Sequence, residues 1–333
     1  MTQPLTIHRG DCRKVLPTLP TASVDCVVTS PPYWNLRDYG TDDQIGREPT
    51  VGEFVETMVA VFREVRRVMT PTGTLWLNLG DSYAAQAGGS QGKTSQRAGR
   101  RHTQRMETKG GLPRKNMVGV PWRVAFALQD DGWILRQDII WNKPNPMPES
   151  VRDRCTKAHE YIFLLTASPR YYFDAAAIEE QVTGNAHARA PMTHQGDALP
   201  YLLDGIEAAD GKARGVNPKA EIGGFNTRQN ASFSAAVVDL VENRNKRSVW
   251  TVPTTPFPGA HFATFPPDLI RPCVRAGCPA GGVVLDPFGG SGTTGMVALE
   301  EGRRAVLIES NPEFADMAAG RANPAAIHPT LGI

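Results

Sequence analysis

The chain has 333 residues, 41% of them hydrophobic and 21% charged, which excludes a disulfide-dependent mini-protein and a fibrous or globally disordered chain. The 36 Lys and Arg nearly balance the 34 Asp and Glu, so only a local basic patch could bind a polyanion. The five cysteines form no CxxC pair and no apolar run is long enough to span a membrane. We therefore expect a reduced, cytoplasmic protein without a metal or a membrane partner.

The first part of the chain alternates predicted strands with a predicted helix. Residues 24–29 are apolar and β-branched and end at a Pro-Pro pair, a pattern typical of a buried parallel strand that runs into a loop. Over residues 55–69 apolar side chains recur at helical spacing, which predicts an amphipathic helix. A Pro-Thr-Gly turn precedes a second apolar strand at 74–79. Strand, helix, strand is the order of an α/β crossover unit.

Residues 84–118 form a basic segment that is rich in Gly, Ser and Gln. Against one acid, Glu107, it carries eight bases, namely Lys93, Arg97, Arg100, Arg101, Arg105, Lys109, Arg114 and Lys115. Such a segment is either a solvated flexible loop or a loop that orders on a phosphate backbone. We favour the second interpretation, because the charge excess has one sign here and the rest of the chain is balanced.

Regular patterns return after the basic segment and again near the end of the chain. A helix is predicted at 120–128 and strands at 133–141 and 161–165. From 175 to 248 the periodicity fades, which suggests an inserted lobe whose fold the sequence does not predict. The last part alternates again, with a strand at 283–285, a helix at 293–301, a strand at 305–308 and a helix at 312–321.

A glycine-rich motif lies between the strand at 283–285 and the helix that follows it. It reads Asp-Pro-Phe-Gly-Gly-Ser-Gly-Thr-Thr over residues 286–294. Glycines at such a turn let the backbone approach a ligand closely, and Glu309 at the end of the next strand suits the two hydroxyls of a ribose. A nucleoside cofactor is therefore predicted, with a tight turn without ligand as the alternative. The motif matches neither the phosphate-binding P-loop nor the GxGxxG dinucleotide pattern.

A second motif, Thr-Ser-Pro-Pro-Tyr-Trp at 29–34, follows the strand at 24–29. Two prolines remove two backbone donors, so the carbonyl groups there face outward as acceptors beside the Ser30 hydroxyl and the Tyr33 ring. This combination suits a planar amino group. A plain turn is the alternative, and this motif is weak evidence by itself.

Together the two motifs resemble those of the DNA methyltransferases that methylate exocyclic amino groups, and the resemblance covers nearly the whole chain. The catalytic motif precedes the cofactor motif here, as in the permuted β class of that family. Four further stretches are family-like: 8–11, 74–83, 141–146 and 261–266. The resemblance implies an α/β, Rossmann-like S-adenosylmethionine-dependent methyltransferase fold with a mostly parallel sheet and an inserted target-recognition region. The domains implied are 1–174 (catalytic part), 175–250 (target recognition) and 251–333 (cofactor-binding part).

The resemblance also implies roles for individual residues. Glu309 would hold the ribose and Asp11 the adenine amino group, although a turn or helix-cap role for Asp11 is nearly as well supported. Ser30, Pro31, Pro32 and Tyr33 would form the catalytic loop, with Tyr33 stacked on the extruded base. Trp34 would be a second wall or a core residue. The remaining implied cofactor-binding residues are Phe265, Pro266, Asp286, Pro287, Phe288, Gly289, Gly290, Ser291, Gly292 and Thr293.

Duplex DNA is the implied partner, and basic residues of the inserted region and of the basic segment are the candidates to contact it. They could read guanines or touch phosphates, and phosphate contact is the default interpretation. The predicted DNA-binding residues are Arg97, Arg100, Arg101, Arg105, Arg228, Arg244 and Lys246.

In the resembled family, Ser before Pro-Pro is typical of cytosine N4 methylation, whereas Asp or Asn is typical of adenine N6. We therefore expect a site-specific cytosine-N4 DNA methyltransferase, with adenine N6 methylation as the first alternative. An amide-nitrogen protein methyltransferase and a non-catalytic nucleic-acid-binding module are further alternatives. The resemblance also leaves open a homodimer and a cognate restriction endonuclease that acts on the same site.

Overall fold

The computed structural model describes residues 3–36, 44–84, 112–182, 187–189, 237–240, 243–254 and 265–322. The chain divides into two compact units, of which the larger comprises Met1–Ile178 with Lys246–Ile333 and the smaller Glu179–Asn245. The domain boundaries expected from the sequence, 1–174, 175–250 and 251–333, stay a prediction. Most of the predicted basic segment lies outside the described residues.

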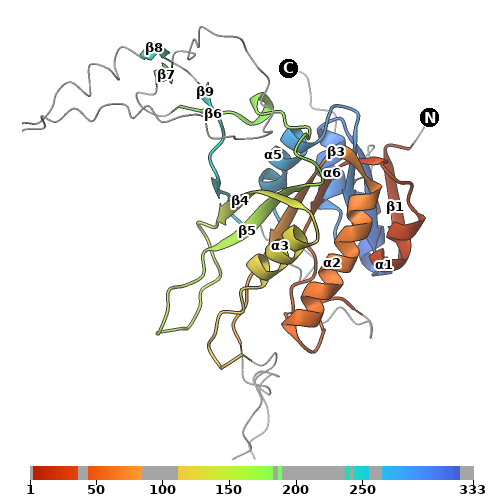
Figure 1. Cartoon of the computed structure of the whole chain (residues 1–333), viewed down its shortest axis with the longest axis vertical. Coiled ribbons are helices and arrows are strands. Elements are labelled where there is room, and N and C mark those ends of the chain that lie inside the picture. Colours follow the sequence, from red (N-terminus) through yellow and green to blue (C-terminus); the bar gives the residue numbers. More distant parts are fainter. Residues whose placement is uncertain are drawn as a thin grey trace, which may run out of the picture. The chain divides into compact units, whose positions relative to one another are not determined.

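An eight-stranded sheet forms the centre of the larger unit as far as it is described (Figure 1). Its strand order is β1-β12-β11-β2-β3-β5-β4-β10. The strands are β1 (Leu5–Arg9), β2 (Val24–Thr29), β3 (Met69–Leu79), β4 (Ile134–Asn142), β5 (His159–Thr166), β10 (Val249–Thr251), β11 (Val283–Asp286) and β12 (Arg304–Glu309).

The sheet is mostly parallel, as the sequence predicted. Strand β5 is antiparallel to both of its neighbours, β3 and β4, and all the other pairs are parallel. Strands β1, β12, β11, β2, β3 and β4 therefore end at one edge of the sheet. In open α/β sheets ligands bind outside this carboxyl edge, and both sequence motifs lie there.

Helices cover both faces of the sheet. They are α1 (Cys12–Val15), η1 (Leu16–Thr18), α2 (Val51–Val68), α3 (Val120–Asp130), η2 (Ala176–Ile178), α5 (Pro267–Gly277), α6 (Thr293–Glu300) and α7 (Pro312–Arg321). The predicted helices are all confirmed, but α2 begins earlier than expected because Thr50 and Glu53 form a reciprocal capping box. Helix α5 and strand β1 were not predicted. Helix α5 contains Pro272, which disrupts the pattern of a helix interior.

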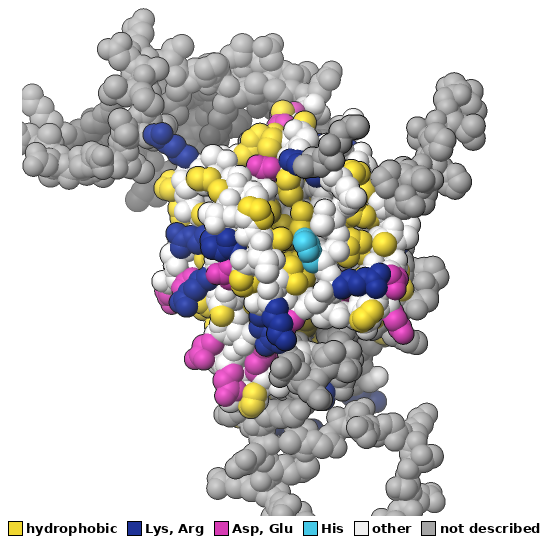
Figure 2. All heavy atoms as spheres, turned by 90° about the vertical axis from the view of Figure 1, so that its right-hand side faces the viewer, with side chains coloured by type: hydrophobic (Ala, Val, Ile, Leu, Met, Phe, Trp, Pro, Cys, Tyr) yellow, Lys and Arg dark blue, Asp and Glu magenta, His cyan; other side chains and the backbone are white. Residues whose placement is uncertain are grey.

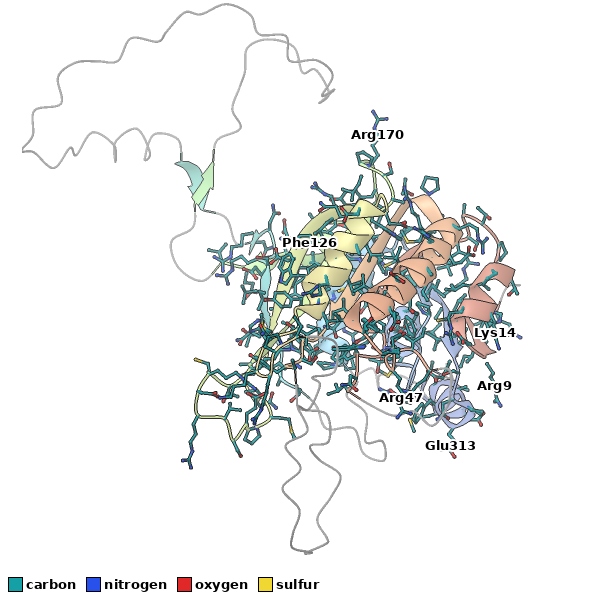
Figure 3. All side chains as sticks on the ribbon, turned by 60° about the horizontal axis from the view of Figure 1, so that its bottom comes forward. Arg9, Lys14, Arg47, Phe126, Arg170 and Glu313 are labelled. Carbon is teal, nitrogen blue, oxygen red and sulfur yellow. The ribbon has the colours of Figure 1, made fainter. Side chains whose placement is uncertain are left out.

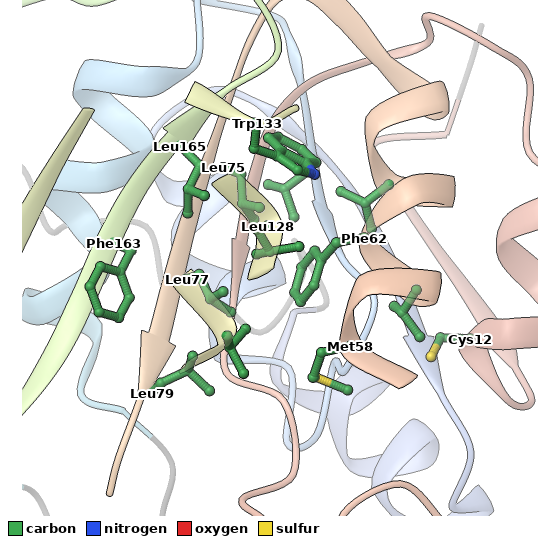
Figure 4. Close-up of a cluster of buried hydrophobic side chains, with 14 of the residues drawn as sticks. Cys12, Met58, Phe62, Leu75, Leu77, Leu79, Leu128, Trp133, Phe163 and Leu165 are labelled. Atoms are coloured by element: carbon green, nitrogen blue, oxygen red, sulfur yellow. The ribbon is translucent and has the colours of Figure 1, made fainter. Parts of the chain in front are cut away.

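The core lies on both sides of the sheet, and β3 shows why. Its Leu75, Leu77 and Leu79 face the cluster formed with α2 and α3 (Figure 4), whereas Trp76 faces the cluster with α5 and α6. The sequence of a central strand that is buried on both faces is a continuous apolar run. Phe62 on α2 is fully buried, and truncating such a side chain to alanine costs ~3–5 kcal/mol.

Four of the five cysteines are core residues. Cys12, Cys26, Cys273 and Cys278 are buried free thiols, and Cys155 is exposed. Burial raises the pKa of Cys278 to about 12, so its thiol stays protonated and unreactive at neutral pH. None of these buried thiols is suited to be a nucleophile.

The smaller unit is described only in four short strands. They pair antiparallel as β6 (Glu180–Gln181) with β9 (Asn243–Arg244) and β7 (His187–Arg189) with β8 (Val237–Leu240). An ion pair of 2.9 Å joins Arg244 to Glu180 across the first pair.

The surface on the β1 side mixes basic and acidic side chains without a large patch of one sign (Figure 2). Figure 3 places Arg9, Arg47 and Glu313 toward one end of the larger unit and Arg170 at the other. No helix within the described ranges is long and apolar enough to cross a membrane.

Candidate active site

Four neighbouring strand ends form the candidate site. The loop after β2 carries Ser30, the loop after β11 carries the glycines, and Glu309 ends β12. Gly10, directly after β1, donates its backbone N–H to the Glu309 carbonyl at 2.8 Å, which places Asp11 beside that acid's backbone. The parallel order of these strands thus gathers residues that are up to 298 positions apart in the chain (11 to 309).

The glycine-rich turn requires glycine at particular positions. Gly292 has a φ of +83°, and a Cβ there would lie 2.7 Å from the Ala318 Cα of α7. Gly290 also has a positive φ, +50°, a region that other residues adopt only at a cost. The Gly289 N–H donates to the Ile308 carbonyl at 2.8 Å, which holds the turn against the end of β12. The turn therefore leaves its outer surface free of side chains at these positions.

Glu309 lies half-buried beside this turn. One carboxylate oxygen accepts the Gly290 N–H at 2.7 Å, and the other accepts the Asn311 N–H, also at 2.7 Å. The oxygen bonded to Asn311 also accepts from the Ser310 hydroxyl at 3.5 Å. Each carboxylate oxygen has two acceptor positions, so one position on the oxygen bonded to Gly290 remains for a ribose hydroxyl, and a ribose could replace Ser310 on the other. The donor set and the glycine turn therefore fit a nucleoside cofactor.

Asp286 faces inward, and the sequence did not predict this. It is 2% exposed, and one oxygen accepts from the Thr29 hydroxyl at 2.6 Å and from the Phe288 N–H at 3.0 Å. The other oxygen accepts from the Thr294 hydroxyl at 2.6 Å. Burial raises the pKa of this carboxyl to about 6, although the three hydrogen bonds oppose the shift. Asp286 thus ties the end of β2 to the glycine turn and to α6, and its predicted contact with the cofactor stays a prediction.

Asp11 caps helix α1, the alternative role that the sequence left open. Its carboxylate accepts the Arg13 N–H at 2.8 Å and forms an ion pair of 2.5 Å with the Arg13 guanidinium. Burial opposes ionisation, yet the contacts with Arg13 lower the pKa of Asp11 below its usual value. An adenine contact by this carboxylate stays a prediction.

The rest of the implied cofactor set is placed as follows. Phe265 is half-buried and packs against the core cluster on the α5 side, and Pro266 is the buried N-cap of α5. Phe288 is half-buried and packs against the other cluster. The Ser291 hydroxyl accepts a hydrogen bond from Arg321 at 2.6 Å, and Thr293 begins α6. Pro287 is buried within the turn.

The catalytic motif offers two acceptors that have no partner among the described residues. Ser30 is half-buried directly after β2, and Pro31 is buried beside it. Within the described residues neither the Ser30 hydroxyl nor the Pro31 carbonyl has a hydrogen-bond partner. Polar groups close to a core normally have partners, so these two atoms are available for a ligand that donates hydrogen bonds.

Tyr33 is held by a polar network that the sequence did not predict. Its hydroxyl donates to Glu160 at 2.7 Å, and the other Glu160 oxygen pairs with the Lys143 ammonium at 2.5 Å. These two charged side chains are only 16% and 17% exposed. A Cβ at Gly80 would lie 2.5 Å from the Tyr33 ring, so glycine is needed there. The only sequence signal was that Gly80 and Lys143 lie in the family-like stretches 74–83 and 141–146.

The other predicted residues have these outcomes. Trp34 is 4% exposed and its indole N–H donates to the Glu48 carbonyl, so it is a core residue and not a wall of the site. Lys246 lies over the Trp250 ring at 5.2 Å. Five predicted DNA-binding residues lie outside the described residues, namely Arg97, Arg100, Arg101, Arg105 and Arg228. Among the described residues no cluster of His, Cys, Asp or Glu could hold a metal ion.

A mostly parallel sheet with a glycine turn after one strand and an acid at the end of the next defines a Rossmann-like nucleoside-cofactor enzyme. Comparison with known proteins identifies the family within this class. A family model for DNA methylases of the N6/N4 group matches residues 24–320. The Type II methyltransferase M.Cfr9I of Citrobacter freundii is 44% identical over 316 residues, which cover 95% of this chain and 87% of that protein. M.XycI of Xanthomonas campestris pv. cyanopsidis is 46% identical with the same coverage.

Solved structures agree in fold. TTHA0409 from Thermus thermophilus, in complex with S-adenosylmethionine, has a TM-score of 0.54 at 25% identity, covering 95% of this chain and 92% of that one. The PvuII cytosine-N4-specific DNA methyltransferase has a TM-score of 0.59 at 17% identity, covering 96% and 87%, a likeness of fold alone. The chain therefore belongs to the N6/N4 DNA methylase family, and its cofactor is S-adenosylmethionine.

Proposed function

We propose that this DNA methyltransferase transfers the methyl group to the exocyclic N4 of cytosine within a short duplex sequence. The observation that carries the proposal is a pair of acceptors at the end of β2 beside Tyr33. They are the Ser30 hydroxyl and the Pro31 carbonyl, and neither has a hydrogen-bond partner in the part of the chain that the structure describes. An exocyclic amino group has two N–H donors, which this pair can accept. In this family a serine at this position, rather than Asp or Asn, favours cytosine.

The two acceptors act on the amino nitrogen itself. Its lone pair is delocalised into the ring, which makes it a poor nucleophile. Hydrogen bonds accepted at Ser30 and Pro31 draw the lone pair out of conjugation and direct it away from the motif. When bound, S-adenosylmethionine supplies an electrophilic methyl group on its sulfonium. Alignment of the reacting groups is worth ~7 kcal/mol or more of the barrier, and the Thr29–Asp286 hydrogen bond fixes the catalytic loop relative to the glycine turn.

Tyr33 and Glu309 have separate tasks in this proposal. Tyr33 stacks on the target base once the base has left the duplex, an extrusion that costs a few kcal/mol. Glu160 holds the Tyr33 hydroxyl at 2.7 Å, which fixes the orientation of the ring. Glu309 binds the ribose through the carboxylate oxygen that accepts from Gly290 and through the second oxygen, where a ribose hydroxyl replaces the Ser310 hydroxyl. Phe288 and the glycines line the rest of the cofactor site. Phe265 and Pro266 close the far wall.

The relatives M.Cfr9I and M.XycI are named Type II methyltransferases, which supports a role as the modification enzyme of a restriction–modification system. The proposed partners are therefore duplex DNA and a cognate endonuclease with the same recognition sequence. The homodimer stays a prediction that sedimentation of the purified chain would test.

The test is single-molecule sequencing of DNA from a methylation-free host that expresses the chain, because it reports the modified base and its sequence context together. A discrete motif carrying N4-methylcytosine is expected. N6-methyladenine alone would replace the proposal by the adenine reaction. No mark at all, with expression verified and S-adenosylmethionine bound, would contradict both.

A further inference from the structure

The connection between β4 and β5, residues 143–158, leaves the sheet at the edge that carries Ser30. Strand β4 runs antiparallel to β5, and β5 antiparallel to β3, so β4 ends at the same edge as β2 and β3. In Figure 1 this connection is the yellow-green loop that extends beyond the ends of β4 and β5. Any duplex whose base reaches Ser30 must therefore pass close to this edge.

Hydrogen bonds tie the root of the connection to the catalytic motif. Lys143 pairs with Glu160 at 2.5 Å, and Glu160 accepts from the Tyr33 hydroxyl at 2.7 Å. The Lys157 ammonium donates to the Asp81 carbonyl at 2.7 Å. Lys143 and Glu160 thus link the connection to Tyr33, the residue proposed to stack on the target base.

The outer part of the connection is braced as well. Asn145 exchanges hydrogen bonds of 3.0 Å and 2.9 Å with the backbone of Thr254. Glu149 pairs with Arg154 at 2.6 Å, and the Arg154 guanidinium lies 4.0 Å from the centre of the Tyr83 ring. Prolines at 144, 146 and 148 fix φ at every second residue. The segment 144–149 is therefore held in place before any partner binds.

Met147 lies in the middle of this braced segment and is 84% exposed, more than any other large hydrophobic side chain in the described residues. Val151, 38% exposed, lies on the same connection. Arg152 is exposed and forms no ion pair within the described ranges. Single exposed apolar residues are common on surfaces, but Met147 lies in a braced segment at the catalytic edge, and the exposed Arg152 follows on the same connection. Exposed apolar side chains, Met among them, are what DNA-binding proteins insert between stacked base pairs.

We propose that Met147 enters the DNA duplex beside the target base and occupies the space that the base leaves when it turns toward Ser30. The proposal rests on the proposed function, because it requires a duplex substrate from which a base is extruded. The thioether side chain is long, flexible and apolar, so it can replace the lost stacking contacts. Arg152 contacts a flanking phosphate in this arrangement.

The test compares Met147→Ala with wild type on two duplexes that contain the methylated motif found by sequencing. One duplex is fully paired, and in the other an abasic position stands opposite the target base, so that no pairing opposes extrusion. On the paired duplex we expect kcat/KM to fall about tenfold, and on the unpaired duplex to stay within about twofold of wild type. Met147→Leu, which keeps an apolar side chain of similar length, should restore most of the activity on the paired duplex.

Val249→Ala is the matched control, since Val249 is 59% exposed on β10 of the same sheet and lies outside the connection. Val249→Ala should leave kcat/KM unchanged on both duplexes. Equal losses for Met147→Ala on the two duplexes, or none on either, would overturn the proposal for Met147 while leaving the methyltransferase assignment intact. A wild-type protein that methylates no DNA would instead contradict the proposed function.

Discussion

The hydrogen bond between Thr29 and Asp286 allows a quantitative prediction about what holds the two motifs together. Thr29→Val removes a hydroxyl that donates at 2.6 Å to a fully buried carboxylate. Hydrogen bonds to charged groups contribute ~1.5–3 kcal/mol, against ~0.5–1.5 kcal/mol for neutral ones. Thr166→Val is the matched control, because Thr166 is equally buried at the end of β5 and donates to the Ser168 carbonyl at 3.0 Å. Urea denaturation at pH 8 should show that Thr29→Val costs about 1–2 kcal/mol more than Thr166→Val.

The pH dependence tests the same reasoning. Burial raises the pKa of Asp286 from 3.8 to about 6, so the native state binds this proton more tightly than the unfolded state. The stability that this group contributes is therefore greatest below pH 4 and decreases by about 3 kcal/mol as the pH rises through 6. Below the native pKa the carboxyl is neutral, so the loss of stability caused by Thr29→Val should fall and approach the loss caused by Thr166→Val. Equal costs for the two variants at pH 8, or an excess that does not change between pH 8 and pH 5, would refute this account.

Further predictions concern the cofactor site, the catalytic loop and the basic segment. Ser30→Ala should lower kcat about a hundredfold, by analogy with removal of one preorganised hydrogen-bonding group, with the S-adenosylmethionine Kd from calorimetry unchanged; equal loss of binding would remove Ser30 from the catalytic role. Glu309→Ala should weaken S-adenosylmethionine binding at least tenfold, a loss of ~1.4 kcal/mol or more, and an unchanged Kd would contradict the ribose contact. Gly292→Ala should lower the free energy of unfolding by ~1–3 kcal/mol, because the Cβ meets Ala318 at a positive φ; wild-type stability in urea would speak against the tight turn. Charge reversal at Arg100 and Arg101 should flatten the salt dependence of the DNA affinity, measured by fluorescence anisotropy. An unaltered slope would show that the basic segment does not contact DNA phosphates.

The sequence predicted the elements whose pattern is local. Strand β3 reads as an apolar run because both of its faces are buried, and α6 follows a glycine turn that marks its start. Helix α5 was missed because Pro267 and Pro272 lie within it, and the loss of one backbone hydrogen bond there is outweighed by burial of Leu269 and Ile270.

The site shows the same division. The sequence predicted that Ser30 and Glu309 lie at strand ends. Because parallel strands end at one edge of a sheet, the predicted parallel sheet places the two residues at that edge. The inward orientation of Asp286 did not follow, because its partner Thr29 is 257 residues away. Glu160 was missed for a related reason: its contact with Tyr33 spans 127 residues and depends on the antiparallel pairing of β5 with β3. Such contacts arise only after the sheet has formed, and a single sequence carries no local signal for them.

The central claim is tested most directly by the base that the purified protein modifies. Unmethylated DNA would be incubated with S-adenosylmethionine and wild-type protein or Ser30→Ala, digested to nucleosides and analysed by mass spectrometry. The account predicts N4-methyldeoxycytidine with wild type and a yield about a hundredfold lower with Ser30→Ala in the initial-rate regime. N6-methyldeoxyadenosine in its place, or no methylated nucleoside from a protein that binds S-adenosylmethionine, would contradict it.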